Sequence, residues 1–195
     1  MRWPVTLRHG PLVLRPLVVG DGRAWRELRS RNADWLRQWE ATMPPDSGSR
    51  PTTFRALVRR LGRMAREGQA LPFAIEVDGE FAGQITVNNI VLGSARFCSV
   101  GYWIGQEYAG RGLVPLAVAM VVDHLFLIER LHRVEIAIRP ENTNSLRVVE
   151  KLGIERCGLA PRYLHIDGAW RDHVLFGITA EEVPGGLVRR LLNGF

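Results

Sequence analysis

Tyr108-Ala109-Gly110-Arg111-Gly112-Leu113-Val114-Pro115 joins a strand-like run at 100–104 to an apolar, helix-like run at 116–122. In a glycine turn of this kind, the turn amides and the first helical amides have no intrahelical partners and converge on one spot. Gly110 and Gly112 lack a Cβ, which allows close backbone approach to a ligand, and Pro115 suits the first helical position. The segment predicts a phosphate or pyrophosphate site, and a tight turn without a ligand is the alternative interpretation.

Two other phosphate-binding motifs do not fit this segment. A P-loop would end in Gly-Lys-Ser or Gly-Lys-Thr, and that ending is missing. The Gly-x-Gly-x-x-Gly pattern of dinucleotide-binding folds is broken because Pro115 occupies the last position. Arg111 adds one cation that could face a bound anion.

Length and composition favour one globular domain. The chain has 195 residues, of which 46% are hydrophobic. We expect a single domain over 1–180, followed by a tail or short helix over 181–195. The longest apolar run, 113–122, is about half the length needed to span a bilayer. These features predict a cytoplasmic protein with no membrane partner.

The net charge of +6 comes almost wholly from arginine, since Lys151 is the only lysine. Such a balance favours acidic ligands, phosphates or nucleic acid. The arginines form no contiguous basic run, so direct nucleic-acid binding is not expected. Cys98 and Cys157 are expected to be small core residues. The five histidines show no zinc-type pairing with the cysteines or with each other, so no metal site is expected.

Hydrophobic periodicity and turn residues predict a mixed α/β (α+β) fold. Strands are expected at 12–17, 71–77, 81–87, 96–104, 133–139, 159–166 and 169–178, and helices after an Asp21 N-cap to 31, at 35–39, 52–66, 115–129 and 145–152. A loop is expected at 44–51, and Asp78-Gly79 supplies a hairpin turn. The result is a mostly antiparallel sheet of about seven strands with helices on both faces.

A second polar segment follows the strand at 133–139. It reads Arg139-Pro140-Glu141-Asn142-Thr143-Asn144-Ser145 and leads into a helix that ends in Glu150-Lys151-Leu152-Gly153-Ile154. Asn142 or Asn144 is suited to cap this helix, and Gly153 to end it. Capping explains one asparagine but not why Asn-x-x-Ser follows a glycine turn about thirty residues earlier.

Together, these two segments resemble the GNAT superfamily of N-acetyltransferases, with the RimJ/RimL branch as the closest type. Further matches are Leu12-x-Leu14-Arg15-Pro16-Leu17 with Asp21 and Trp25, and Asp167-Gly168-Ala169-Trp170-Arg171-Asp172. The resemblance spans about residues 10 to 180. It implies that acetyl-CoA, or another acyl-CoA, is the co-substrate and that its pyrophosphate lies on the glycine turn. The residues implied to bind it are Tyr102, Trp103, Ile104, Ala109, Gly110, Arg111, Gly112, Leu113, Val114, Asn142 and Ser145.

The chain departs from the family pattern at three positions. Ala109 stands where the glycine turn usually begins with Gln or Arg, and Val114 replaces a small residue. Both changes leave the backbone amides in place. Val149 occupies the position of a tyrosine that protonates the departing thiolate in many members. In the RimJ/RimL branch the serine is the suggested acid, which here is Ser145.

The resemblance implies direct transfer of the acyl group to an amine. Candidates for the general base are Glu107, His165, Asp167 and Asp172, with His165 first because imidazole titrates in the useful range. The acceptor is expected to contact Asn88, Asn89, His165 and Asp167, although the two asparagines could instead form a bulge.

The preferred acceptor is the N-terminal α-amine of a protein, such as a ribosomal protein. The alternatives are a small-molecule amine, a non-catalytic CoA-binding regulatory module, and a nucleic-acid- or ribosome-binding protein. Acetyl and larger groups such as succinyl stay open for the acyl group, as do monomer and homodimer.

Overall fold

The computed structural model describes residues 1–45, 47–48 and 53–194. Its centre is an eight-stranded sheet in the order β1-β2-β3-β4-β5-β6-β8-β7. Neighbouring strands are antiparallel except β5 and β6, which are parallel. The strands are β1 (Leu7–His9), β2 (Leu12–Pro16), β3 (Leu71–Val77), β4 (Glu80–Val91), β5 (Phe97–Ile104), β6 (Arg133–Ile138), β7 (Glu155–Ile166) and β8 (Ala169–Thr179). The mixed, mostly antiparallel sheet is confirmed; β1 was not predicted, because three residues carry too little periodicity.

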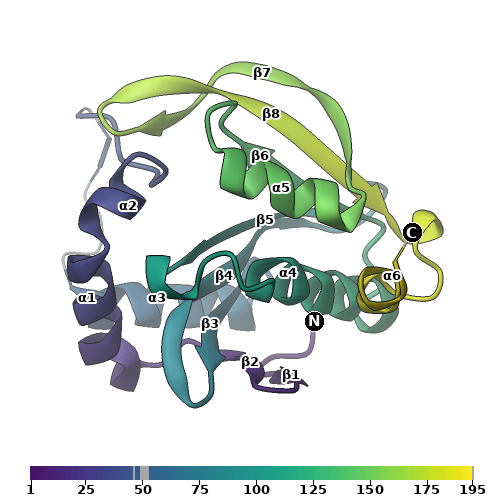
Figure 1. The fold of residues 1–195 in the computed structure, drawn as a ribbon, viewed down its shortest axis with the longest axis horizontal. Coiled ribbons are helices and arrows are strands. Elements are labelled where there is room, and N and C mark those ends of the chain that lie inside the picture. Colours follow the sequence, from purple (N-terminus) through teal and green to yellow (C-terminus); the bar gives the residue numbers. More distant parts are fainter. Residues whose placement is uncertain (46, 49–52, 195) are drawn as a thin grey trace.

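Helices cover both faces of the sheet, as predicted. In Figure 1, α4, α5 and α6 lie in front of the sheet, α3 lies behind it, and α1 and α2 stand at its left end. Their bounds are α1 (Gly22–Arg31), α2 (Ala33–Arg37), α3 (Phe54–Arg66), α4 (Leu113–Asp123), α5 (Thr143–Leu152) and α6 (Leu187–Asn193). Short helical turns are η1 (Val19–Asp21), η2 (Gln106–Tyr108), η3 (His124–Ile128, π-helical) and η4 (Ala180–Glu182).

Two cores follow from this layering. The larger one lies between the sheet and α4, α5 and α6, and residues 117–122 of α4 are all buried in it. A helix that is apolar on all sides, as at 116–122, is typically buried in this way. The smaller core joins α1 and α3 to the other face through Leu28, Phe54, Val58 and Phe81.

The gap between β5 and β6 is the feature that positions the site. The two strands pair only where residues Phe97 to Ser99 of β5 lie beside residues Arg133 to Glu135 of β6. Beyond these residues they separate, while β4 remains paired with β5 and β8 with β6. The backbone is therefore open in the middle of the sheet, at the level of residues 100–102 and 136–139.

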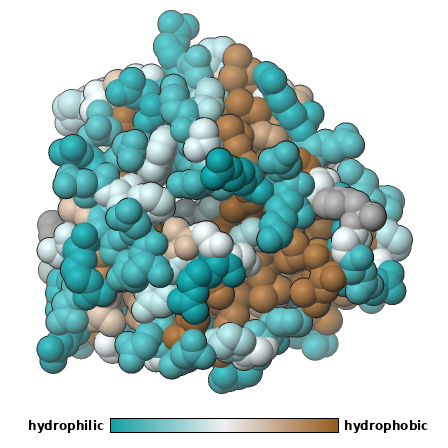
Figure 2. All heavy atoms as spheres, viewed as in Figure 1, coloured by the Kyte–Doolittle hydropathy of each residue, from teal (hydrophilic) through white to brown (hydrophobic). Residues whose placement is uncertain are grey.

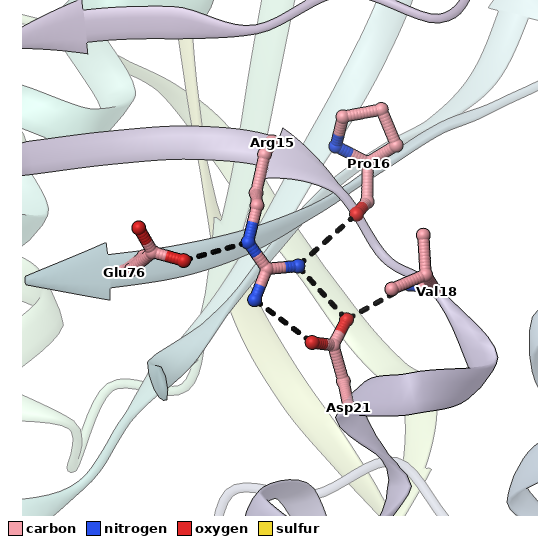
Figure 3. A network of polar contacts seen from close by, with 5 residues as sticks. All are labelled: Arg15, Pro16, Val18, Asp21 and Glu76. Carbon is pink, nitrogen blue, oxygen red and sulfur yellow. Dashed lines mark hydrogen bonds and ion pairs between the residues drawn. The ribbon is translucent and has the colours of Figure 1, made fainter. Parts of the chain in front are cut away.

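Asp21 takes a different role from the predicted one. It precedes α1, but its side chain caps no amide of that helix. Instead its carboxylate accepts hydrogen bonds from the Arg15 guanidinium at 2.8 and 3.0 Å and from the Val18 amide at 2.8 Å, and Arg15 also binds Glu76 at 2.7 Å (Figure 3). The carboxylates of Asp21 and Glu76 thus bind the same Arg15 guanidinium, and these contacts fix the start of α1 against β2 and β3.

Three smaller expectations are also corrected. The helix after the glycine turn begins at Leu113, so Pro115 is its third residue rather than its first. Cys98 is buried as expected, but Cys157 is exposed, because β7 lies at the edge of the sheet. The predicted helix after 115 changes to a π-helical turn at His124.

Some expectations at the chain's less regular parts have mixed outcomes. Residues 46 and 49–51 of the predicted loop, and the predicted helix start at 52, lie outside the described residues. The division at residue 180 stays a prediction, although Val183 and Leu187 belong to the larger core.

Helix α3 carries five arginines and no acidic residue, against a net charge of +6 for the whole chain, so much of the positive charge is concentrated there.

No helix in the part of the chain that the structure describes is long and apolar enough to cross a membrane. Among the same residues, no three His, Cys, Asp or Glu side chains are placed to hold a metal ion.

Candidate active site

The glycine turn after β5 presents a row of free amides. Gly110 and Gly112 have φ of 75° and 76°, values that favour glycine. The amides of residues 110–114 have no hydrogen-bond partner among the described residues, whereas the next available amide, that of Leu116, donates to the Gly112 carbonyl at 3.3 Å. Gly112 is the N-cap of α4, so these donors gather at the positive end of a buried helix. This arrangement suits a pyrophosphate.

A cavity of about 400 Å³ runs along this turn. Figure 2 shows a hollow with hydrophilic side chains at its rim on the face that carries α4 and α5. The predicted co-substrate residues that line the cavity are Tyr102, Trp103, Ile104, Ala109, Gly110, Gly112, Leu113, Val114, Asn142 and Ser145. Arg111 is the exception, because its guanidinium lies over the Tyr108 ring instead, 5.9 Å from the centroid.

The sequence did not identify the cations that line this cavity. Arg147 and Lys151 both reach it from α5, where they lie four residues apart on one face. Both are at the protein surface, so they form a charged rim rather than a buried pair. They can supply the charge that the family pattern places at the position of Ala109.

Asn142 and Ser145 form the start of α5. The Asn142 side chain accepts a hydrogen bond from the Ser145 amide at 3.1 Å, so Asn142, not Asn144, is the cap. This bond uses the Asn142 carbonyl oxygen and leaves its amide group available to a ligand. Val149, at the position of the missing tyrosine, is buried in the larger core.

Tyr102 carries the most unusual polar atom of the site. Its Oη is buried without a hydrogen-bond partner of standard geometry among the described residues. Burial raises the pKa of Tyr102 to about 12, and the Ser145 hydroxyl partly opposes that rise, so Ser145 lies near Tyr102 without completing a hydrogen bond. The phenol is thus protonated at neutral pH and free to donate. An unsatisfied buried hydroxyl is costly, which indicates a partner supplied by a ligand.

A second cavity, of about 370 Å³, lies on the other side of β5. The indoles of Trp25, Trp39 and Trp103 form its apolar part, while Gln84, Thr86 and Asn88 of β4 supply polar groups. Glu40 also lines it and is paired with Arg29, whose guanidinium lies 4.6 Å from the Trp25 ring centroid. The cavity therefore offers flat apolar walls, hydrogen-bonding groups and no net charge from this pair.

A third cavity, of about 180 Å³, occupies the gap between β5 and β6 and joins the other two. It shares Tyr102, Asn142 and Ser145 with the first cavity, and Ala41 and Gly101 with the second. Trp39 and Tyr102 line all three. A group bound along the glycine turn can therefore meet a group from the opposite side at Tyr102.

The four predicted base candidates lie outside these cavities. His165 Nδ1 lies 2.7 Å from the Thr42 hydroxyl, and its ring packs edge-on against Trp170. Asp167 is an exposed turn residue with φ of 46°, and Asp172 accepts from the Arg162 amide at 2.7 Å. For Glu107, burial acts to raise the pKa, but hydrogen bonds from its own backbone, Asn32 and Arg31 lower it.

The two predicted acceptor-side asparagines separate. Asn88 lines the second cavity, and its amide donates to the Thr86 carbonyl at 3.2 Å. Asn89 has φ of 51°, lies in the β4 bulge and donates to the Ser99 hydroxyl at 3.0 Å. The bulge interpretation therefore holds for Asn89. His173 of β8, which the sequence did not single out, lines the third cavity.

Comparison with known proteins agrees with this geometry. Residues 11–155 match the model of the acetyltransferase (GNAT) domain family. The chain is 32% identical over 186 residues to the [ribosomal protein uS5]-alanine N-acetyltransferase of Escherichia coli K12, covering 93% of this chain and 94% of that protein. It is 29% identical over 163 residues to the E. coli K12 spermidine N(1)-acetyltransferase, covering 83% and 82%.

Among solved structures, Mycobacterium smegmatis RimJ in complex with CoA-disulfide superposes with a TM-score of 0.89 at 39% identity, covering 98% of this chain and 95% of that one. The sequence identity and the structural agreement extend over nearly the whole chain, and the family match covers the elements up to residue 155, which line the first two cavities. The chain belongs to the GNAT family and is an acyl-CoA-dependent N-acetyltransferase.

Proposed function

We propose that this enzyme acetylates the N-terminal α-amine of a protein, of the ribosomal-protein class that its uS5-acetylating relative modifies. The observation that carries the proposal is the character of the second cavity. It combines three indoles with Gln84, Thr86 and Asn88, groups that can hold the side chains and the peptide groups of an extended N-terminus. We infer a single primary amine at the end of a mostly neutral chain.

A polyamine acceptor, suggested by the spermidine-acetylating relative, fits this cavity less well. A polycation needs several carboxylates for its charges. Glu40 is the one acid among the described residues that line the cavity, and Arg29 already neutralises it. The small-molecule alternative is therefore the second candidate.

On the acyl side, we propose that the amides of residues 110–114 hold the pyrophosphate while Arg147 and Lys151 face the remaining phosphate charge. Acetyl-CoA supplies the activated acyl group. Tyr102 Oη and the Ser145 hydroxyl face the place where the thioester would lie, one of them donating to the sulfur as it leaves. Tyr102 thereby fills the role that Val149 cannot.

The proposal also covers the oligomeric state of the enzyme and the identity of the acyl group that it transfers. For the oligomeric state, a monomer and a homodimer are both retained. Direct binding of nucleic acid is not part of the proposed reaction. The acyl group is proposed to be acetyl rather than succinyl, by analogy with the acetyl-transferring relatives.

The test is a comparison of acceptors under the same acetyl-CoA concentration. Release of CoA thiol is followed with short peptides that have a free N-terminus, with the same peptides blocked at the N-terminus but retaining a lysine, and with spermidine. We expect turnover with the free peptides, none with the blocked peptides, and at least roughly tenfold lower kcat/KM for spermidine, as expected when a second charge must be buried without a partner. Preference for the lysine side chain or for spermidine would overturn the proposed acceptor class.

A further inference from the structure

His173 is a buried histidine that faces the gap in the sheet. It is 3% exposed and pairs with Ala160 of β7, one residue beyond the last pair between β6 and β8, Ile138 with Val174. Side chains alternate between the faces of a strand, so His173 lies on the face opposite that of Val174 and Phe176. Phe176 packs against the larger core, on the α5 side. His173 therefore belongs to the side of the sheet from which the acceptor is proposed to enter.

One hydrogen bond fixes the tautomer of this imidazole. His173 Nδ1 lies 3.0 Å from the Arg171 carbonyl oxygen. A carbonyl can only accept, so Nδ1 carries the hydrogen, and the neutral ring presents an unprotonated Nε2. Nε2 has no hydrogen-bond partner among the described residues, because the one printed bond of this ring is made by Nδ1. Since the side chain lines the third cavity, Nε2 is available to a group bound there.

The surroundings keep this imidazole neutral. Burial is the main cause that lowers the pKa of His173 below the ordinary value, and the Arg139 charge adds to it. The bond to Arg171 and the charges of Glu141 and Asp172 oppose the shift without reversing it. The Tyr163 ring also lies near His173, with 5.7 Å between the two ring centroids. The imidazole of His173 is therefore a proton acceptor at neutral pH.

Tyr102 and Ser145 line the same cavity of about 180 Å³. Tyr102 packs against the larger core, so it lies on the α5 side of the sheet, opposite the side of His173. The three groups thus face one volume from the two sides of the sheet, with the acceptor-side group unprotonated and Tyr102 protonated. That is the division of protonation states that transfer from a thioester to an amine requires.

We propose that His173, rather than His165, is the general base of the reaction. The proposal rests on the proposed function only in requiring an amine acceptor that enters from the second cavity. As the acceptor nitrogen bonds to the acyl carbon, one proton of that nitrogen passes to His173 Nε2 and the carbon–sulfur bond breaks. The sulfur leaves as a thiolate that accepts a hydrogen bond from Tyr102 Oη or Ser145. Solvent later removes the proton from His173 and can protonate the released thiolate.

His165 provides the matched comparison. It lies eight residues earlier on the paired strand, is only partly buried, and lines none of the three cavities. Its Nδ1 is engaged by Thr42, whose backbone amide also donates to the His165 carbonyl at 2.8 Å. We assign it to fixing the segment after α2 against β7.

The test compares His173→Gln with His165→Gln, using whichever peptide or simple amine the wild-type enzyme acetylates. We expect about a 100-fold fall in kcat for His173→Gln, with unchanged CoA affinity, and less than roughly a threefold change in kcat for His165→Gln. The wild-type pH profile of kcat/KM should lose activity on the acid side through a pKa below about 6.5, the ordinary value for histidine. Both profiles should rise as the free amine deprotonates, and the His173→Gln profile should lack only the additional limb below about pH 6.5.

A second measurement does not depend on a variant folding or on the acceptor. Imidazole nitrogen NMR of the wild-type protein should show His173 protonated on Nδ1 at neutral pH, with a pKa below about 6.5. The proposal is overturned if His173→Gln retains wild-type kcat and pH profile, or if Nε2 carries the hydrogen. Turnover of spermidine but not of peptides would contradict the proposed acceptor class. The role of His173 would then be tested with spermidine as the amine.

Discussion

The two sides of the β5–β6 gap are encoded in different ways. Most of the acyl side comes from two continuous segments, 102–115 and 142–151, each leading from a strand end into a helix, and Trp35, Leu36 and Trp39 add to it from α2 and the residues after it. The acceptor side is assembled from α1, α2, β4, β7 and β8, which lie far apart in the sequence. A backbone-built phosphate site can be recognised from local sequence, whereas a side-chain-built acceptor site becomes visible only when the sheet is formed.

The largest effect is expected at Tyr102, where the two sides meet. Tyr102→Phe removes one buried donor and keeps the ring, so we expect kcat to fall about 100-fold. CoA affinity should stay within about twofold of the wild-type value, because the phosphates are held elsewhere. Steady-state thiol release and calorimetric CoA binding measure the two quantities. The control is Tyr108→Phe, which changes a phenol of the first cavity that does not reach the gap. Equal losses in both variants would show that the buried Oη has no special role.

The backbone character of the acyl side is tested at Gly112. With φ of 76°, a β-branched residue would be strained by about 1–3 kcal/mol, so Gly112→Val should weaken CoA binding by about 10- to 100-fold. Gly93→Val is the matched control, since Gly93 has φ of 72° and, like Gly112, open space within 4 Å of the place where a Cβ would stand. Calorimetry with CoA should detect little change in that control. Similar losses in both would mean that the effect is on folding and not on the phosphate site.

Much of the acyl side could be predicted from the sequence because its signals are local. The turn glycines, an asparagine cap at 142 or 144 and the Gly153 helix end each depend on a few neighbouring residues. The contribution of Arg147 and Lys151 was missed because surface cations on a helix have no distinctive spacing. The lack of a hydrogen-bond partner for Tyr102 Oη could not be predicted, since it depends on how α5 approaches β5.

On the acceptor side, the sequence identified the late hairpin and placed His165 first, whereas the histidine of that hairpin that lines the third cavity is His173. His165 and His173 lie on different strands of this hairpin, and which of them lines the third cavity depends on how the hairpin packs beside β6, which local sequence does not show. Asp21 shows the same limit, because its binding to Arg15 depends on how β2 turns into α1. Cys157 was assigned to the core from its neighbours, while its exposure follows from the strand order.

The charged rim offers a weaker test of the acyl side. Removing both cations in Arg147→Gln/Lys151→Gln should raise KM for acetyl-CoA about fivefold at low salt, because each exposed ionic contact contributes up to about 1 kcal/mol. The difference should shrink as salt screens the charges. Arg8→Gln/Arg156→Gln removes two exposed charges away from the cavity and serves as the control. A salt-independent increase in KM would argue against electrostatic binding at this rim.

The smallest expected effect concerns acceptor choice. Arg29→Gln leaves Glu40 without its partner in the second cavity, so the rate with a polycationic acceptor should improve. We expect kcat/KM for spermidine to rise about threefold, in line with one partly exposed charge pair. Arg23→Gln breaks the exposed Arg23–Glu27 pair outside the cavity and should change nothing. A fall in spermidine turnover in Arg29→Gln would contradict the neutral character assigned to this cavity.

The most direct test of the meeting point is a crystal structure with a bisubstrate analogue, in which CoA sulfur is joined through an acetyl bridge to the α-nitrogen of a short peptide. We expect pyrophosphate on the amides of residues 110–114, sulfur within hydrogen-bonding distance of Tyr102 Oη or Ser145, and peptide among Trp25, Trp39 and Trp103. A bridge that bypasses the gap between β5 and β6, or a peptide bound away from these indoles, would show that the two sides do not meet at Tyr102.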